Sequence, residues 1–294
     1  MVRNDKGFQI ILHMAMIFLA LLVLFPLALL IMGSITAESE VILHGYSLWP
    51  KAFDFSAYRY ILGEGSIFHS YFITIAVTVI GTVAGVMITT MISYTLTVPG
   101  LPGKKILSFY ILFTMLFSGG LVPKYMMWCN MFHIKNTIWA LIIPSLLCSA
   151  FHIMITRSYF QSNIPQEVLE SARIDGMSEF GIFFKIVFPL SVPILATIGF
   201  MKALMYWNDW TNSLYYITDK RLVGIQALLN NLLTNVQYLS QSMEGMSIAT
   251  ENAVIPTLTI RLAIAVVGML PMIVLYPFFQ KYYTKGLLVG AVKG

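Results

Sequence analysis

The 294-residue chain is too apolar for a water-soluble domain, because 58% of its residues are hydrophobic and 11% are charged, whereas soluble domains carry about 25% charged residues. The net charge of +5, from 18 lysines and arginines against 13 aspartates and glutamates, comes without a basic cluster interleaved with aromatic residues, which argues against a nucleic-acid-binding protein. Two cysteines, Cys129 and Cys148, make neither a disulfide framework nor a metal-ligand set.

Six apolar segments follow one another along the chain, and a helix of about twenty apolar residues is long enough to cross a membrane. They are expected at residues 8–34, 69–98, 106–122, 137–156, 191–207 and 253–279. Arg3 and Lys6 precede the first segment as in a signal peptide, but the segment is too long for a cleaved one and is expected to be retained. The predicted fold class is an all-α membrane protein with six transmembrane helices.

Four residues inside these segments stand out. Gly81 and Gly85 form a small-xxx-small pair in the second segment, which allows close helix packing, although lipid-facing helices also tolerate glycine. Lys202 in the fifth segment and Arg261 in the sixth are costly at membrane depth. We interpret both as structural side chains that lie near water or pair with a carboxylate.

The stretches between the segments are mixed or polar. Residues 35–68 place charges beside aromatic side chains, as in a loop at the membrane interface. Residues 208–252 have helical periodicity, which predicts a structured external or re-entrant loop. The expected organisation is an N-terminal span and external loop at 1–68, a membrane-spanning core at 69–280 with a polar loop at 157–190, and a tail at 281–294.

Lysine and arginine counts orient the segments, because cytoplasmic loops are enriched in these residues. With the N-terminus inside, the inner side holds ten, namely Arg3, Lys6, Lys104, Lys105, Arg157, Arg173, Lys185, Lys281, Lys285 and Lys293. The outer side holds six, namely Lys51, Arg59, Lys124, Lys135, Lys220 and Arg221. This excess predicts cytoplasmic N- and C-termini and a cytoplasmic loop at 157–190.

That loop is the longest polar insertion with helical order. Pro165 suits a first helical position and Gly176 the residue just past a helix end, and Ser178 suits the cap of a second helix. Two short helices that meet at a glycine hinge are therefore predicted. The first carries an apolar ridge of Val168, Leu169, Ala172 and Ile174 flanked by Glu167, Glu170, Arg173 and Asp175. Such a helix suits either a cleft on another protein or the surface of its own bundle.

Part of this loop matches a known signature. Glu170-Ser171-Ala172, followed by Gly176 and then by Ile186 and Pro189, resembles the EAA motif of ABC importer permeases, and in particular the maltose-type permeases that import carbohydrates. Ser171 stands where that family usually has alanine. Trp207-Asn208-Asp209 also resembles an element of sugar permeases, as does the ending at 278–294, so the resemblance covers nearly the whole chain.

The resemblance implies the MetI-like fold of a type I ABC importer permease, in which the first loop helix is a coupling helix. Its implied partners are a second homologous permease, two ATP-binding subunits, an extracellular sugar-binding lipoprotein or periplasmic binding protein, a carbohydrate substrate and membrane lipid. ATP and Mg would belong to the partner ATPase subunits, with no cofactor or metal in this chain, and the implied location is the bacterial plasma (inner) membrane. The residues implied in coupling to the ATPase are Glu167, Glu170, Ser171, Ala172, Arg173, Asp175 and Gly176.

A polar and aromatic cluster follows the fifth segment, and it consists of Trp207, Asn208, Trp210, Thr211 and Asn212. Carbohydrates present apolar ring faces and many hydroxyls, so aromatic side chains beside amides and hydroxyls suit a substrate path. Asn208, Thr211 and Asn212 would share one face of a continuous helix. An aromatic belt at the membrane surface is the alternative interpretation.

The energy source is expected to be another chain. The sequence has no Gly-x4-Gly-Lys-Ser/Thr phosphate loop and no recognisable catalytic or metal motif, so a transport subunit is predicted rather than an enzyme. An ion-coupled secondary transporter is the main alternative, but it would place acidic or histidine residues in its spans and often shows paired repeats. The external segment 226–247 is expected either to contact the delivery protein or to form a plain cap.

Overall fold

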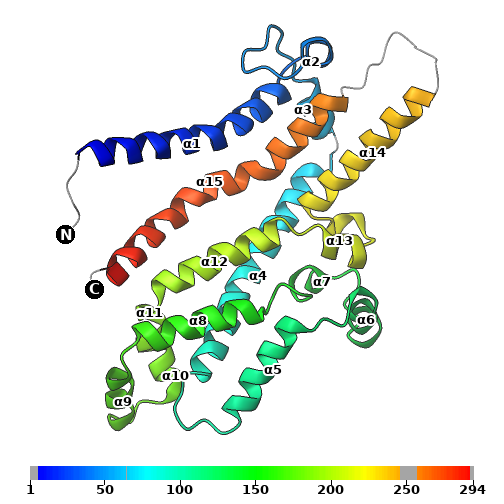
Figure 1. Cartoon of the computed structure of the whole chain (residues 1–294). Coiled ribbons are helices and arrows are strands. Elements are labelled where there is room, and N and C mark those ends of the chain that lie inside the picture. Colours follow the sequence, from blue (N-terminus) through cyan, green and yellow to red (C-terminus); the bar gives the residue numbers. More distant parts are fainter. Residues whose placement is uncertain (1–5, 64, 246–256, 292–294) are drawn as a thin grey trace. The chain divides into compact units, whose positions relative to one another are not determined.

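The computed structural model describes residues 6–63, 65–245 and 257–291, and within these ranges the chain is helical (Figure 1). An isolated bridge between Thr36 and Phe53 is the only β-pairing in the described part. The chain forms two compact units, one of residues 1–67 and 229–270 and the other of residues 68–228 and 271–294. The expectation of an all-α protein is confirmed.

The first unit contains α1 (Lys6–Ser34), α2 (Glu38–His44), α3 (Ser56–Gly63), most of α14 (Ile225–Gly245) and the first part of α15 (Thr257–Ala291). The buried Glu38 carboxylate accepts hydrogen bonds from the backbone N–H groups of Leu258 (2.8 Å) and Thr259 (2.9 Å) and from the Thr259 hydroxyl (2.7 Å). A carboxylate at this position satisfies free N–H groups of the first turn of α15 and complements its dipole.

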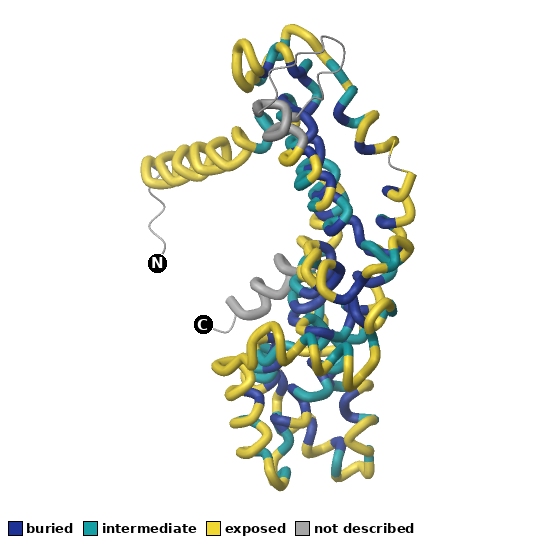
Figure 2. The backbone as a smooth tube through the Cα atoms, turned by 90° about the vertical axis from the view of Figure 1, so that its right-hand side faces the viewer, coloured by how far each residue is buried: buried dark blue, intermediate teal, exposed yellow. Residues whose placement is uncertain are grey.

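Helix α1 is apolar on all sides. None of the most apolar 18 residues of its span at 7–34 is buried, and Figure 2 shows this helix exposed along most of its length. A helix that is apolar all round belongs in lipid or against another apolar surface. The first predicted span is therefore confirmed as one continuous helix long enough to cross a membrane.

The second unit holds the remaining helices. They are α4 (Ile67–Thr95), α5 (Lys104–Leu116), α6 (Leu121–Met126), η1 (Met127–Met131), α7 (Trp139–Ile142), α8 (Ala150–Asn163), α9 (Gln166–Ile174), α10 (Glu179–Ile182), η2 (Phe183–Val187), α11 (Phe188–Leu190), α12 (Val192–Trp207), α13 (Thr211–Tyr216) and η3 (Lys220–Leu222). The start of α14 and the end of α15 complete it. Within this unit the Phe200 ring on α12 packs near the rings of Tyr276 and Phe279 on α15, at 5.9 and 5.1 Å between centroids.

Three spans are continuous and two are bent. Among the described residues, helices at 7–34, 67–95 and 258–280 are long and apolar enough to cross a membrane alone; positions 253–256 of the predicted sixth segment lie outside the description. The helix at 104–116 and the one at 121–131 form a pair bent by 118°, and those at 179–190 and 192–207 form a pair bent by 83°. Counting each bent pair as one span gives five.

The predicted fourth span, 137–156, is wrong as a continuous helix. It consists of the four-residue α7 and of α8, which runs on to Asn163, and residues 143–149 between them are not helical. Pro144 lacks the N–H group that would continue the helix, and Ser145 has a positive φ of 63°, which lies outside the right-handed helical region. The backbone therefore breaks where hydropathy alone predicts a helix.

Candidate functional site

The polar loop folds as an elbow, which we define as residues 165–187. Pro165 precedes α9, and Gly176 follows its end with a φ of +78°. The N–H of Gly176 donates to the Arg173 carbonyl and the N–H of Met177 to the Ala172 carbonyl, both at 3.0 Å. This pair of bonds is the Schellman ending of a helix, which favours glycine at the left-handed position. The predicted glycine hinge is confirmed.

A second cap starts α10. The Ser178 hydroxyl accepts a hydrogen bond from the N–H of Gly181 at 3.2 Å, as the sequence predicted. A Cβ on Gly181 would lie 2.8 Å from the Met177 Cγ atom, so a larger residue would disturb the turn. Local signals in the sequence therefore account for both helix ends of the elbow.

The apolar ridge of α9 faces two ways. Leu169 and Ala172 are buried in a cluster that includes Ile182 and Phe183 of the same elbow and Tyr94 of α4. In contrast, Val168 is 43% exposed and Ile174 is 85% exposed. Of the two interpretations of the ridge, packing on the helix's own bundle applies to Leu169 and Ala172, whereas Val168 and Ile174 stay exposed.

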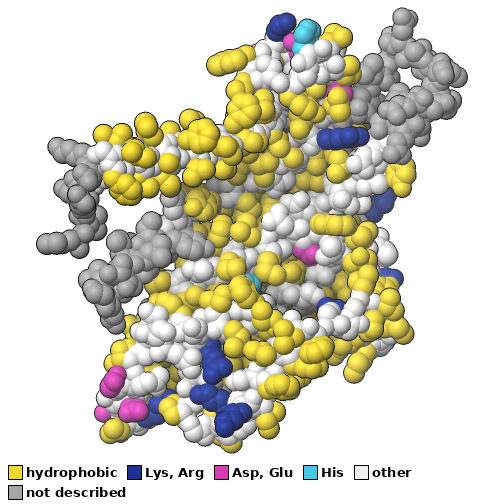
Figure 3. Space-filling model, viewed as in Figure 1, with side chains coloured by type: hydrophobic (Ala, Val, Ile, Leu, Met, Phe, Trp, Pro, Cys, Tyr) yellow, Lys and Arg dark blue, Asp and Glu magenta, His cyan; other side chains and the backbone are white. Residues whose placement is uncertain are grey.

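The charged side chains of α9 also fall into two groups, one exposed and one paired within the elbow. The side chains of Glu167, Glu170 and Asp175 are exposed, and in the described part of the chain they form no ion pair. Figure 3 shows acidic side chains gathered over α9. Arg173 instead pairs with Glu179 of α10, with 2.7 Å between Nε and Oε1. This hydrogen bond raises the pKa of the Arg173 guanidinium, and it was not predicted from the sequence.

The cluster after the fifth span is divided by a helix break. Helix α12 ends at Trp207 and α13 begins at Thr211, so Asn208, Thr211 and Asn212 do not share one helix face as expected. The Asn208 amide donates to the Leu204 carbonyl at 2.9 Å, and Trp210 is 39% exposed. Trp207 and Asn212 are buried. Only part of the predicted substrate path is therefore accessible.

Three polar side chains from α12 and α13 support the broken fourth segment. Lys202 Nζ donates to the carbonyls of Leu146 (3.3 Å) and Leu147 (3.0 Å). The Tyr206 hydroxyl donates to the Ile142 carbonyl at 2.9 Å, and the Asn212 amide donates to the Pro144 carbonyl at 3.1 Å. Because water is absent from a bilayer core, carbonyls released by a helix break must find donors within the protein. The structural interpretation of Lys202 stands on these contacts.

Two of these side chains, Lys202 and Tyr206, also pack against the glycine pair of α4. A Cβ on Gly81 would lie 2.4 Å from the Tyr206 ring, and a Cβ on Gly85 would lie 3.0 Å from Lys202 Cδ and 3.1 Å from the Leu147 carbonyl oxygen. Both glycines are therefore needed for close approach. Between the two interpretations of the pair, close packing is correct.

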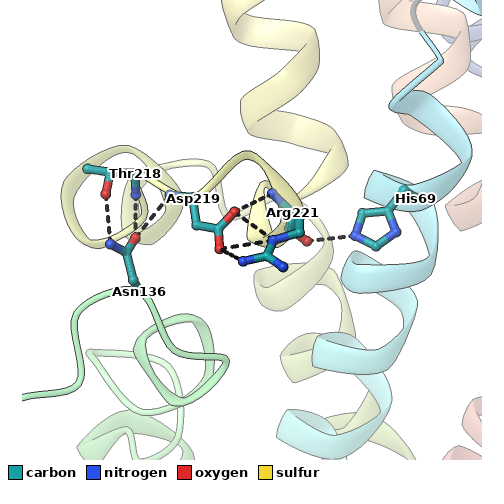
Figure 4. Close-up of polar contacts among 5 residues, drawn as sticks. All are labelled: His69, Asn136, Thr218, Asp219 and Arg221. Atoms are coloured by element: carbon teal, nitrogen blue, oxygen red, sulfur yellow. Dashed lines mark hydrogen bonds and ion pairs between the residues drawn. The ribbon is translucent and has the colours of Figure 1, made fainter.

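A further polar network, shown in Figure 4, joins segments that are far apart in the sequence. The Asn136 amide donates to the Thr218 hydroxyl (2.7 Å), and its oxygen accepts from the N–H groups of Thr218 (2.6 Å) and Asp219 (3.1 Å). Arg221 pairs with Asp219 at 3.0 Å, and its carbonyl accepts from His69 Nε2 at 2.7 Å. Hydrogen bonding from Arg221 lowers the pKa of the Asp219 carboxyl. No local sequence signal marks these partners.

The described side chains offer no metal site, since no group of three His, Cys, Asp or Glu residues among them is close enough to hold an ion. A mostly apolar cavity of about 530 Å³ lies among α4, α5 and α8, with Tyr110, Thr114 and Cys148 in its lining.

Residues 81–289 match the family described as the binding-protein-dependent transport system inner membrane component. The chain belongs to this family, whose members are the membrane-spanning permease components of ABC importers. Its fold is accordingly that of an ABC importer permease, and this membership favours ATP-driven import over ion-coupled secondary transport. The family is one of transport components and not of enzymes.

Curated relatives agree with this assignment. The chain is 37% identical to the polygalacturonan/rhamnogalacturonan transport system permease protein YtcP of Bacillus subtilis (strain 168), over 99% of this chain and 100% of that protein. It is 29% identical to the arabinooligosaccharides transport system permease protein AraQ of the same organism, over the full length of both. A solved bacterial ABC transporter involved in the import of the acidic polysaccharide alginate contains a chain that superposes with a TM-score of 0.78 at 28% identity, covering 96% of this chain and 99% of that one.

Proposed function

We propose that this chain forms half of the translocation path of an importer for an oligosaccharide delivered by a binding protein outside the cell. A second homologous permease would form the other half, and each permease would dock one ATP-binding subunit. The carbohydrate assignment rests on relatives that carry polygalacturonan, rhamnogalacturonan and arabinooligosaccharides. ATP and Mg bind to the partner subunits in this scheme.

The observation that carries the proposal is the two-sided helix α9. Its inner side is anchored by the buried Leu169 and Ala172, while Val168 and Ile174 are exposed beside three free carboxylates. An apolar ridge with acidic flanks suits a cleft with basic groups on an ATPase subunit. In this scheme Glu167, Glu170, Ser171 and Asp175 face the ATPase, whereas Ala172, Arg173 and Gly176 hold the shape of the elbow.

The proposed setting is the bacterial plasma membrane, with both termini and the elbow at 165–187 in the cytoplasm. The lysine and arginine excess on that side supports this orientation. The domain division also remains a proposal, with the core at 69–280 as the permease proper and 281–294 as a cytoplasmic tail. In a background with Cys129 and Cys148 replaced by alanine, a cysteine introduced at the exposed Ser171 should react with an impermeant maleimide only after the cell is opened. Labelling of this cysteine in intact cells would reverse the orientation.

For the sugar itself we propose contact with the exposed members of the cluster at 207–212. Trp210 offers a ring face, and Asn208 and Thr211 offer an amide and a hydroxyl, which suits the mixed surface of a carbohydrate. Trp207, whose ring lies 6.1 Å from that of Tyr71, and the buried Asn212 would hold these groups in place.

Replacement of Gly176 by leucine tests the docking role. A branched side chain is strained at a φ of +78°, so the end of α9 should change its path. We expect Gly176→Leu to abolish both sugar uptake and the coupled ATP hydrolysis in vesicles containing the whole complex, while the permease remains in the membrane. Gly176→Asn is the matched control, because asparagine tolerates this conformation, and it should retain most activity. Normal uptake by the leucine variant would remove the docking role of the elbow.

A further inference from the structure

Glu179 joins three elements through one carboxylate. Arg173, in the last turn of α9, reaches Glu179 across the Gly176 turn, with 2.7 Å between Nε and Oε1 and 3.4 Å between Nη2 and Oε2. The Tyr94 hydroxyl, at the end of α4, donates to Oε2 of the same carboxylate. The two oxygens of Glu179 therefore connect both arms of the elbow to a membrane-spanning helix.

Besides these hydrogen bonds, the elbow is held by apolar packing, because Leu169 and Ala172 of α9 are buried against Ile182 and Phe183. Helix α9 has nine residues and α10 has four, so neither is stable as an isolated helix, and a glycine lies between them. A cavity of about 160 Å³ lies next to the contact and is lined by Met91, Tyr94, Thr95, Glu179, Phe180 and Phe183. Side chains are thus not closely packed around the carboxylate. The hydrogen bonds are the directional part of the contact, because they act only at short distance and narrow angle.

Tyr94 is well placed to receive motion from the elbow. Its side chain is 6% exposed, and its ring centroid lies 5.7 Å from that of Phe183, in the segment that follows α10. The Tyr94 ring and hydroxyl thus contact different parts of the elbow. A displacement of α9 and α10 as one body would therefore move the end of α4 with it.

We propose that Glu179 is a positioning residue that locks the elbow angle and transmits displacement of α9 to α4, so that ATP hydrolysis on a partner subunit is coupled to opening of the path. This inference rests on the proposed function. Arg173 and Tyr94 act through Glu179. Loss of the lock leaves α9 able to dock, but only the apolar contact with Tyr94 then connects the docked helix to α4, so less of its displacement reaches α4.

The test measures sugar imported per ATP hydrolysed in vesicles that contain the complete complex. Glu179→Gln keeps the shape and removes the charge, and Tyr94→Phe removes one oxygen while the ring contact with Phe183 remains. Because hydrogen bonds to charged groups are stronger than neutral ones, we expect the ratio to fall roughly three- to tenfold in Glu179→Gln, and by less in Tyr94→Phe. The ATPase subunits should co-purify as they do with the parent protein.

Two further variants sharpen the result. Tyr110→Phe removes the hydroxyl of an exposed tyrosine on α5 and should leave the ratio unchanged. The exchange Arg173→Glu with Glu179→Arg reverses the ion pair, and the Tyr94 hydroxyl can then accept from the guanidinium at position 179, so most of the ratio should be recovered. If Glu179→Gln and Tyr94→Phe both keep the parental ratio, or if the reversed pair recovers nothing, the lock is refuted. If the parent complex itself shows no ATP-dependent uptake, the proposed function fails first.

A spectroscopic measurement reports the lock directly. Spin labels at Ser171→Cys and Thr95→Cys, in a background with Cys129 and Cys148 replaced by alanine, report the distance between α9 and the end of α4. We expect one narrow distance distribution in the nucleotide-free complex and a broad one after Glu179→Gln. An equally narrow distribution in both proteins would overturn the inference even if transport changes.

Discussion

Lys202 shows what a charged residue at membrane depth can do without a carboxylate partner. It is completely buried on α12 and donates to two backbone carbonyls of the broken fourth segment. Backbone carbonyls are strong acceptors, and leaving one unpaired in a buried site costs free energy. The residue thus stabilises a non-helical stretch that the bilayer would otherwise exclude.

Replacement of Lys202 by methionine should therefore destabilise the protein. The side chain keeps its length, but the carbonyls of Leu146 and Leu147 lose their donor, and a buried unsatisfied group costs about 1–3 kcal/mol. The expected result is a lower midpoint of thermal unfolding in detergent. Lys124→Met, at an exposed position, is the control and should leave the midpoint unchanged. A Lys202→Met protein as stable as its parent would contradict the role of this contact.

The glycines of α4 allow a graded prediction. Gly81→Ala places a methyl group 2.4 Å from the Tyr206 ring, whereas Gly85→Ala meets its nearest neighbour at 3.0 Å. Overpacking of this kind costs about 1–3 kcal/mol, and the Gly81 variant should lie at the upper end. Gly7→Ala is a control within a helix and has no atom nearby. Stability is measured by thermal unfolding. If all three variants are equally stable, the Tyr206 and Lys202 side chains can move aside at no cost, and the prediction is wrong.

At the level of elements, the sequence predicts what local signals encode. Pro165, Gly176 and Ser178 mark the ends of α9 and the start of α10, and the structure places them there. Hydropathy finds the continuous spans, but a running average does not register a single break such as the one at Pro144. The pairing of Arg173 with Glu179 and of Glu179 with Tyr94 was not predicted, because both depend on how the elbow folds back on α4.

The polar network in Figure 4 gives a prediction about one element. Asn136 adopts a positive φ of 56° and holds the segment 217–223 through three hydrogen bonds. Asn136→Gly keeps the backbone freedom and removes only the side chain. We expect faster amide hydrogen exchange across 217–223, since two backbone N–H groups lose their acceptor. Unchanged exchange in that segment would mean that other contacts hold it.

At the scale of the whole molecule, the sequence contains no phosphate-binding loop, so we expect this chain alone to be unable to drive transport. Vesicles that contain this chain alone should not concentrate any sugar, with or without ATP or an ion gradient. Uptake should appear only when a second permease, the ATPase and the delivery protein are added together. Accumulation driven by an ion gradient in vesicles with this single chain would restore the secondary transporter as an interpretation.

The carbonyl contacts also dictate an order of assembly. A ribosome makes residues 137–163 before it makes α12 and α13, so the carbonyls of the fourth segment emerge ahead of Lys202, Tyr206 and Asn212. Until those side chains arrive, the nascent segment depends on water or on the insertion machinery for hydrogen bonds. We therefore expect the fourth segment to settle in the bilayer only after α12 and α13 have been synthesised, and chains truncated before them to be degraded faster than the full-length chain.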